Sequence, residues 1–194
     1  MGLMERPAGI LASVRRMRSV CAELLAAWAK TDVDRLAFAD DWGSRRSLLI
    51  SPAFWREYFR PMCRGYAQIA HGASRRIFMR AGGCVLDIYP GLIEIGVGAV
   101  NSRLLCMGAG SARPLARPIT FWFEIDRRHL LPFGTPARAD SPARGVHAAL
   151  WRCGGCIAQC ESGAAAKPGN ARQVFATCDA PSPRAEKGGG HVGV

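Results

Sequence analysis

Lysine is scarce in this chain, although the chain is strongly basic. Its 194 residues include three lysines, so arginine supplies 23 of the 26 basic residues, and the formal net charge is +11. A nucleic-acid-binding domain gathers its basic residues on one face and places aromatic residues among them. Here the arginines are scattered from Arg15 to Arg152. We therefore expect no nucleic acid as a partner, and a small anionic substrate fits a basic protein better.

Long apolar runs and the features of a signal peptide are missing as well. No stretch approaches the ~20 apolar residues that a membrane-spanning helix requires. Glu5 and Arg6 come early, and no long apolar run follows them as it would in a secretory signal. We therefore expect a cytoplasmic protein with no membrane partner, whose eight cysteines are thiols rather than disulfides.

Histidine shows no spacing typical of metal ligands, and none of the four histidines follows a predicted strand. Cys153, Cys156 and Cys160 form a C-x₂-C-x₃-C run, which leaves a zinc or cluster site open as an alternative. Alternation along an extended segment would send Cys156 and Cys160 to one side and Cys153 elsewhere. We therefore predict no metal and no cofactor, and Cys160 is the cysteine to consider if zinc is found.

Helical and extended patterns alternate along the chain. The segments that resemble short buried strands are 35–39, 76–79, 97–101, 119–123 and 155–158. The segments with helical spacing are 13–30, 51–71, 87–95, 141–152 and 169–178. Strands that alternate with helices indicate a parallel sheet or barrel. Because a full eight-stranded barrel needs about 250 residues, we predict an α/β fold of about five βα units, a partial (β/α)8 TIM barrel.

Polar residues follow each predicted strand at its carboxyl end, where parallel α/β folds bind their ligands. In chain order these residues are Asp40, Asp41 and Trp42, then Arg80, then Asn101, then Glu124 and Asp126, then Gln159, Cys160 and Glu161. Acids dominate, and clustered carboxylates can bind a cation or the N–H groups of a pyrrole, or carry out acid–base chemistry. For Asp40 and Asp126, capping of the following loop or helix is the alternative interpretation.

Several motifs follow one another in order between Thr31 and Cys178. DDWGS at 40–44 precedes LLISPAFWR at 48–56, and PGLIEIGV occupies 90–97. TFWFEID at 120–126 precedes LPFGTP at 131–136, and GGCIA at 154–158 precedes PGN at 168–170. In this order the motifs resemble those of the uroporphyrinogen-decarboxylase-like superfamily. The resemblance implies that the chain supplies the C-terminal part of a TIM barrel over residues 31–180. Apolar spacing predicts a helical segment at 1–30 before it. The proline, glycine and charged residues after it predict a disordered tail at 181–194.

The resemblance also implies a function. Uroporphyrinogen decarboxylase is a carboxy-lyase of porphyrin biosynthesis that removes carboxyl groups from a tetrapyrrole without a cofactor. We expect the same reaction on a tetrapyrrole or related anionic molecule. The expected catalytic residues are Asp40, Asp41, Arg80, Asp126 and Glu161, whose acids would hold pyrrole N–H groups while Arg80 neutralises a carboxylate. The expected substrate-binding residues are Trp42, Asn101, Glu124 and Gln159.

Two alternatives remain. The superfamily includes zinc methyltransferases that act on corrinoid proteins, and their His and Cys zinc ligands correspond here to Arg80 and Gly82 of Arg80-Ala81-Gly82-Gly83. A methyltransferase-like protein is therefore an alternative in which only Cys160 remains as a ligand. The other alternative is a non-catalytic remnant or half-barrel, inactive as this short chain. Because an open half-barrel exposes strand edges, a homodimer or a partner chain would complete it.

Overall fold

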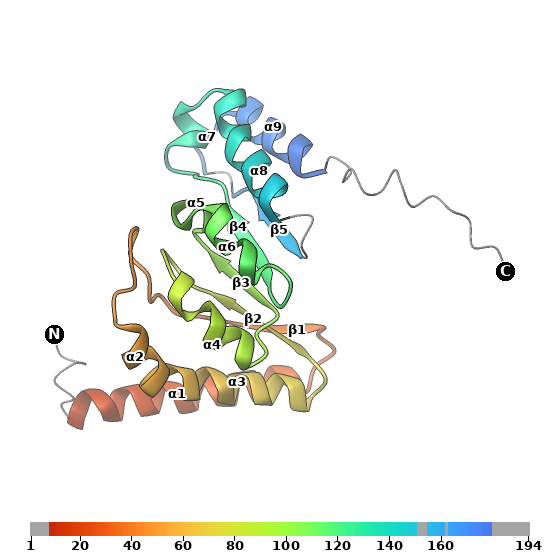
Figure 1. Ribbon diagram of the computed structural model, residues 1–194. Helices are drawn as coiled ribbons and strands as arrows, with labels where there is room; N and C mark the ends of the chain where they lie inside the picture. The colour runs from red at the N-terminus through yellow and green to blue at the C-terminus, as the bar shows by residue number, and fades with distance from the viewer. Residues whose placement is uncertain (1–7, 151–154, 162, 180–194) are drawn as a thin grey trace. The chain divides into compact units, whose positions relative to one another are not determined.

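Five strands form the framework of the computed structural model, which describes residues 8–150, 155–161 and 163–179 (Figure 1). The strands are β1 (Arg35–Ala39), β2 (Arg76–Arg80), β3 (Ala99–Ser102), β4 (Thr120–Glu124) and β5 (Cys156–Gln159), and they follow one another in the sheet in this order. β1 pairs with β2 in parallel, and β4 pairs with β5 in parallel. The predicted α/β fold of βα units, as in part of a (β/α)8 barrel, is confirmed.

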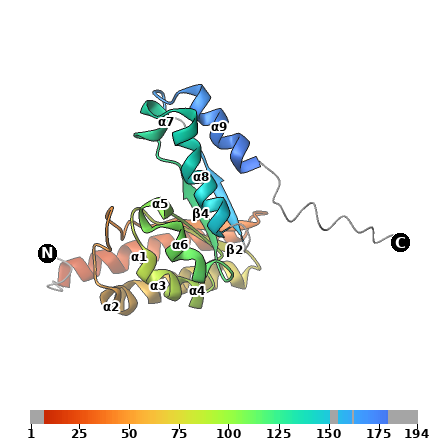
Figure 2. The same cartoon turned by 45° about the horizontal axis from the view of Figure 1, so that its top comes forward.

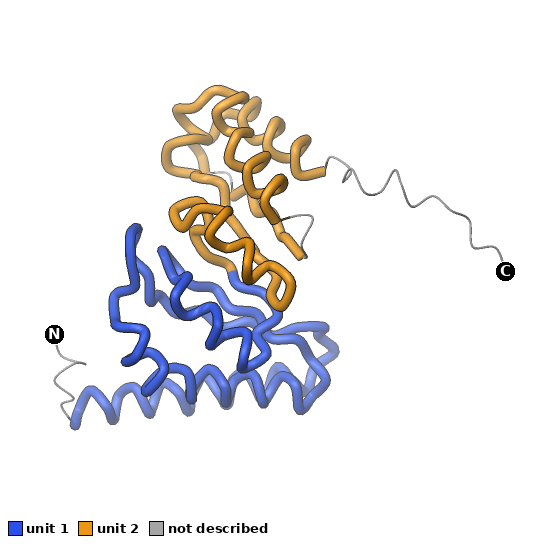
Figure 3. The backbone as a smooth tube through the Cα atoms, in the orientation of Figure 1, with its two compact units in different colours: residues 1–100 blue, residues 101–194 orange. Residues whose placement is uncertain are grey.

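The chain divides into two compact units, residues 1–100 and residues 101–194, which Figure 3 shows in separate colours. The helices of the first unit are α1 (Ala8–Ala29), α2 (Pro52–Phe54), α3 (Arg60–Gly72) and α4 (Tyr89–Glu94), together with a π-helical turn at Trp55–Phe59 and a 3₁₀ turn at Leu86–Ile88. α1 lies within the segment at 1–30 that was expected to be helical, of which residues 1–7 are outside the described part, and it packs against α3 within this unit.

A nearly continuous helical stretch covers the predicted helix at 51–71, but it has three parts. Ser51 begins it, because its hydroxyl accepts a hydrogen bond from the Phe54 amide at 3.1 Å and Pro52 takes the first helical position. The π-helical turn Trp55–Phe59 then leads into α3, whose second residue is Pro61. Pro61 has no N–H to donate to a carbonyl one turn earlier, so the backbone widens just before it.

Side chains of β1 and β2 alternate between the core of the first unit and its surface. The register pairs Leu36 with Ile77 and Phe38 with Met79, and Phe38 lies against Tyr66 of α3 with ring centroids 5.3 Å apart. These four residues therefore face the helices. The intervening residues Arg35, Ala37 and Ala39 on β1 and Arg76 and Arg80 on β2 are exposed.

The second unit contains α5 (Leu104–Met107), α6 (Ala109–Ala112), a 3₁₀ turn at Arg113–Leu115, α7 (Leu130–Phe133), α8 (Pro136–Leu150) and α9 (Pro168–Asp179). The helices α8 and α9 lie side by side, as Figures 1 and 2 show. Phe121 and Phe123 of β4 are buried in the core of this unit with Val146 and Leu150 of α8 and Val174 of α9.

The structure corrects the predicted helices of the second unit. The helices α5, α6 and α7 were not predicted, because a helix of four residues is too short to display a helical period. The helix predicted at 141–152 begins earlier, at Pro136. The Thr135 hydroxyl accepts a long hydrogen bond from the Arg138 amide at 3.4 Å, and Thr135-Pro136 is the start signal, whereas Pro142 lies inside the helix.

Two predictions fall on parts of the chain that the structure does not describe. The end of the helix predicted at 141–152 reaches residues 151 and 152, and the disordered tail predicted at 181–194 lies beyond Asp179. Both lie outside the described residues. Among the described residues, no helix combines the length and the apolar character that crossing a bilayer requires.

Candidate functional site

In the first unit, hydrogen bonds join the loops that follow β1 and β2. The Gly82 amide donates a hydrogen bond to Asp41 Oδ1 at 2.7 Å, and the Cys84 amide donates one to the Ser44 carbonyl at 2.7 Å. The Asp40 amide donates to the Arg80 carbonyl at 3.0 Å and so extends the pairing of the two strands by one bond. The structure thus brings together two motifs that lie 40 residues apart in the sequence.

The position of Asp41 explains the glycine at position 82. A Cβ atom added to Gly82 would lie 2.5 Å from Asp41 Oδ1. A side chain at position 82 would therefore push the Asp41 carboxylate away from the Gly82 amide, which donates a hydrogen bond to it. One oxygen of the predicted catalytic residue Asp41 is therefore used to hold the two loops together. Arg80, at the end of β2, is exposed beside these loops.

The described residues do not fit zinc. Among the residues that the structure describes, no three His, Cys, Asp or Glu side chains lie close enough to hold a metal ion. Burial raises the pKa of Cys160, and zinc binds the thiolate rather than the thiol. In the alternative C-x₂-C-x₃-C site, Cys153 lies outside the described residues, and burial raises the pKa of Cys156 to about 12.

Asp40 is a half-buried carboxyl group whose proton is held more tightly than usual. Burial raises its pKa, and the charge of Asp41 adds to this effect, while a hydrogen bond from the Asp41 backbone opposes it. The buried thiol of Cys63 on α3 lies close enough that burial and the charge of Asp40 together raise the pKa of Cys63 to about 12. Of the predicted catalytic acids, Asp40 therefore has the surroundings that suit a proton donor.

The Asp40→Asn variant is expected to be more stable than the parent chain at neutral pH. A carboxyl group whose pKa is raised in the folded state is harder to ionise there than in the unfolded chain. Its ionisation therefore lowers the stability of the folded state at pH values above that pKa. As the pH falls through the ordinary value of 3.8, the carboxyl becomes protonated in the unfolded state as well, and the part of the difference that comes from ionisation should diminish. Melting temperatures of both proteins across pH 3.5 to 8 would test this. If the variant were less stable than the parent at neutral pH, that result would contradict the raised pKa of Asp40.

Trp42, predicted to bind substrate, instead packs in the core of the first unit. It is 4% exposed, and its ring lies 5.7 Å from that of Trp55 and 5.6 Å from that of Phe59. The sequence placed Trp42 at the strand exit correctly, but the chain turns there and points the indole toward the helical turn at Trp55–Phe59. Direct contact between Trp42 and a ligand would require this aromatic cluster to open.

In the second unit, Asp126 caps the turn that leads into α7, as its alternative interpretation suggested. Its Oδ1 accepts hydrogen bonds from the amides of Arg128 at 2.9 Å and His129 at 3.0 Å, and its Oδ2 lies 3.2 Å from His129 Nδ1. Burial opposes ionisation of Asp126, but these hydrogen bonds and the charge of His129 outweigh it, so the pKa of Asp126 lies below its usual value. A carboxylate committed to a cap in this way is a poor proton donor.

Two other predicted residues of the second unit have distinct surroundings. Glu161 forms an ion pair with Arg127, so the loops that follow β4 and β5 are linked by charge. Asn101 on β3 is 3% exposed, and within the described part of the chain no group hydrogen-bonds its Nδ2 atom. Leaving a buried amide without a partner costs about 1–3 kcal/mol.

Glu124 and Gln159 lie next to each other at the carboxyl ends of β4 and β5. They are register partners, as are Trp122 and Ile157 two residues earlier, and alternation places all four on the face opposite to Phe121 and Phe123. We call these four residues the β4–β5 polar face. All are half-buried, and among the described residues none hydrogen-bonds the buried Oε1 atom of Gln159. The structure therefore brings together two of the predicted substrate-binding residues beside an indole ring.

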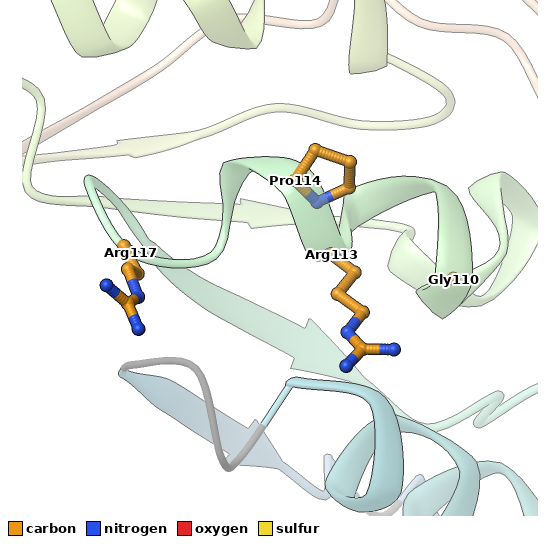
Figure 4. A pocket seen from close by; sticks show the side chains of 4 residues that line it. All are labelled: Gly110, Arg113, Pro114 and Arg117. Atoms are coloured by element: carbon orange, nitrogen blue, oxygen red, sulfur yellow. The ribbon is translucent and has the colours of Figure 1, made fainter.

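The arginine-lined cavity of the second unit lies away from these strand exits. It has a volume of about 450 Å³ and is lined by Gly110, Arg113, Pro114 and Arg117. In Figure 4 the side chains of Arg113 and Arg117 extend from the ribbon toward the same side. Arg117 precedes β4, so this cavity is near the amino end of that strand, whereas Glu124 lies at its carboxyl end. Two guanidinium groups would suit an anion, but the predicted site residues do not reach this cavity.

The chain is similar in fold to a solved structure, a methyltransferase from Methanosarcina mazei. The TM-score is 0.61 at 15% sequence identity, and the match covers 83% of this chain and 47% of that chain. The chain thus spans about half the length of the structure that it matches. No protein-family model and no curated protein matches this sequence. At this level of identity the likeness concerns the fold: five βα units arranged as in part of a methyltransferase.

Proposed function

We propose that this chain is the substrate-binding part of a methyltransferase-like (β/α)-barrel enzyme and that its substrate is a corrinoid. The observation that carries the proposal is the β4–β5 polar face, where Glu124 and Gln159 lie side by side with Trp122 at the carboxyl ends of two strands. Ligands of parallel α/β folds bind at that end of the strands. The likeness in fold to a methyltransferase supports this class of reaction.

The chemistry of the β4–β5 polar face suits the rim of a corrinoid ring. Corrinoids carry carboxamide side chains, whose N–H groups can donate to the carboxyl group of Glu124 and whose C=O groups can accept from the side-chain amide of Gln159. The indole of Trp122 offers an apolar surface against the ring. In methyl transfer, the methyl group leaves its donor and bonds to a nucleophilic acceptor, and these residues would hold and orient the molecule.

The second candidate function is removal of carboxyl groups from a porphyrinogen, the reaction implied by the motif resemblance. The half-buried acid Asp40, with its raised pKa, favours it, because each carboxyl group leaves as CO₂ and a proton takes its place on the carbon. Glu124 does not separate the two candidates, because its carboxyl group could accept hydrogen bonds from pyrrole N–H groups or from corrinoid carboxamides. The two candidates predict different ligands, which a binding experiment distinguishes.

A titration of the full chain with methylcobalamin, followed by tryptophan fluorescence and by the absorbance of the corrin, tests the proposal. We expect saturable binding that weakens about fivefold in the Gln159→Ala variant, because one hydrogen bond in a desolvated site contributes about 1 kcal/mol. The matched control is Gln173→Ala, which removes an amide from α9 of the same unit. It should bind methylcobalamin like the parent.

The same preparation should be incubated with uroporphyrinogen, and its products separated by chromatography. Turnover of uroporphyrinogen that is lost in Asp40→Asn would replace the first candidate by the second. No binding of methylcobalamin, or equal binding by the parent and Gln159→Ala, would refute the role of the β4–β5 polar face. Melting temperatures of all variants establish that they are folded.

A further inference from the structure

The turn between α6 and β4 carries two arginines that line one cavity. Arg113 begins the 3₁₀ turn Arg113–Leu115, and Arg117 lies four residues after it. Both residues are exposed, and together with Gly110 and Pro114 they line a cavity of about 450 Å³. Figure 4 shows both side chains extending toward the same side of the ribbon. A cavity of this volume is large enough to hold a small molecule.

Buried alanines hold this turn in place. Ala112, directly before Arg113, is 0% exposed, and Ala116, directly before Arg117, is 1% exposed. The Ala116 amide donates a hydrogen bond to the Arg113 carbonyl at 3.2 Å, which closes the 3₁₀ turn. Because each arginine follows an anchored alanine, the core fixes the backbone that presents the two guanidinium groups. A ligand therefore meets a preformed backbone, which lowers the entropic cost of binding.

The positive charge of this turn has no nearby acid to balance it. The segment 95–123, which contains both arginines, has no aspartate or glutamate. Among the described residues, no carboxylate forms an ion pair with Arg113 or Arg117, whereas Arg127 of the same unit pairs with Glu161. Two cations that share a cavity repel each other, and an anion bound between them would turn this repulsion into attraction.

We propose that this cavity binds the diphosphate group of a small anion. A guanidinium group presents parallel N–H donors that match a pair of phosphate oxygens. Arg113 and Arg117 extend from different points of the turn, so a diphosphate offers one phosphate to each arginine, whereas a single phosphate does not. Free pyrophosphate and nucleoside diphosphates both carry this group.

The diphosphate site lies apart from the β4–β5 polar face. Arg117 comes three residues before β4 begins at Thr120, and Glu124 is the last residue of that strand. Five residues of a strand span about 13 Å from first to last. A ligand in the cavity therefore does not use Glu124 or Gln159, and the proposal does not depend on corrinoid binding. The Gln159→Ala variant should bind pyrophosphate as tightly as the parent does.

Isothermal titration calorimetry of the full chain with sodium pyrophosphate tests the proposal. We expect one saturable site, and binding that is at least about tenfold weaker in Arg113→Gln and in Arg117→Gln, because each change removes charged hydrogen bonds to a phosphate. The matched control is Arg172→Gln, which removes the same charge from an exposed residue of α9 and should bind like the parent. Melting temperatures without ligand establish that all variants are folded.

Titrations with orthophosphate and with ADP complete the test. Orthophosphate should bind at least about tenfold more weakly than pyrophosphate, because it lacks the second phosphate. ADP that binds more tightly than pyrophosphate would assign the diphosphate to a nucleotide, whereas weaker binding of ADP would assign it to the free anion. Absence of pyrophosphate binding by the parent, equal affinity for orthophosphate, or an equal loss in Arg172→Gln would overturn the proposal.

Discussion

Replacing Gly83 with alanine is expected to destabilise the first unit by about 3 kcal/mol or more. Gly83 has a φ of +74°, a region that residues with a side chain rarely adopt. A Cβ atom there would lie 2.2 Å from the Gly43 carbonyl oxygen and 2.3 Å from that of Ser44. Because both obstacles are backbone atoms, the two loops after β1 and β2 would have to separate, and the hydrogen bond between Asp41 and Gly82 would break with them.

Chemical denaturation of Gly83→Ala beside the parent would measure this loss. The matched control is Gly145→Ala on α8, where an added Cβ meets nothing within 4 Å. Because alanine is the better helix former, this control should be more stable than the parent by about 0.5–1 kcal/mol. If Gly83→Ala unfolded at the same denaturant concentration as the parent, the close contact between the two loops would not exist in solution.

Replacing Asn170 with alanine should have the second large effect, a loss of about 1–3 kcal/mol in the second unit. Asn170 is 1% exposed at the start of α9, and its Nδ2 donates to the carbonyls of Leu130 at 3.2 Å, Leu131 at 2.9 Å and Gly134 at 3.0 Å. These carbonyls belong to α7 and the residue after it, so one side-chain amide fastens α7 to α9.

The Asn170→Asp variant separates the hydrogen bonds from the shape of the side chain. A carboxylate has almost the same shape but donates nothing, and it would face three carbonyl oxygens, so it should destabilise more than Asn170→Ala. The control Arg172→Ala changes an exposed residue of the same helix and should stay within about 0.5 kcal/mol of the parent. Equal melting temperatures for Asn170→Asp and the parent would contradict the assigned contacts.

The sequence alone determined the βα architecture of this protein. All five strands lie where their apolar patterns predicted, because a buried strand is a short local run of apolar residues. The polar residues after the strands were also identifiable, since they follow such runs directly. The sequence signals that start helices at Ser51-Pro52 and Thr135-Pro136 are local as well. The second signal was overlooked, because Ser141-Pro142 resembles it. The motif that contains Asn170 was recognised, but not its role.

What each polar side chain does was decided by the tertiary structure. Asp41 and Gly82 are 41 residues apart, and Asn170 lies at least 36 residues from the carbonyls it holds, so no local pattern reveals these partners. The same holds for Trp42, which only packing turns toward Trp55, and for the outer face of α1, whose apolar residues a sequence cannot divide into covered and uncovered. Local periodicity encodes elements, whereas partners and burial depend on segments that meet only when the chain folds.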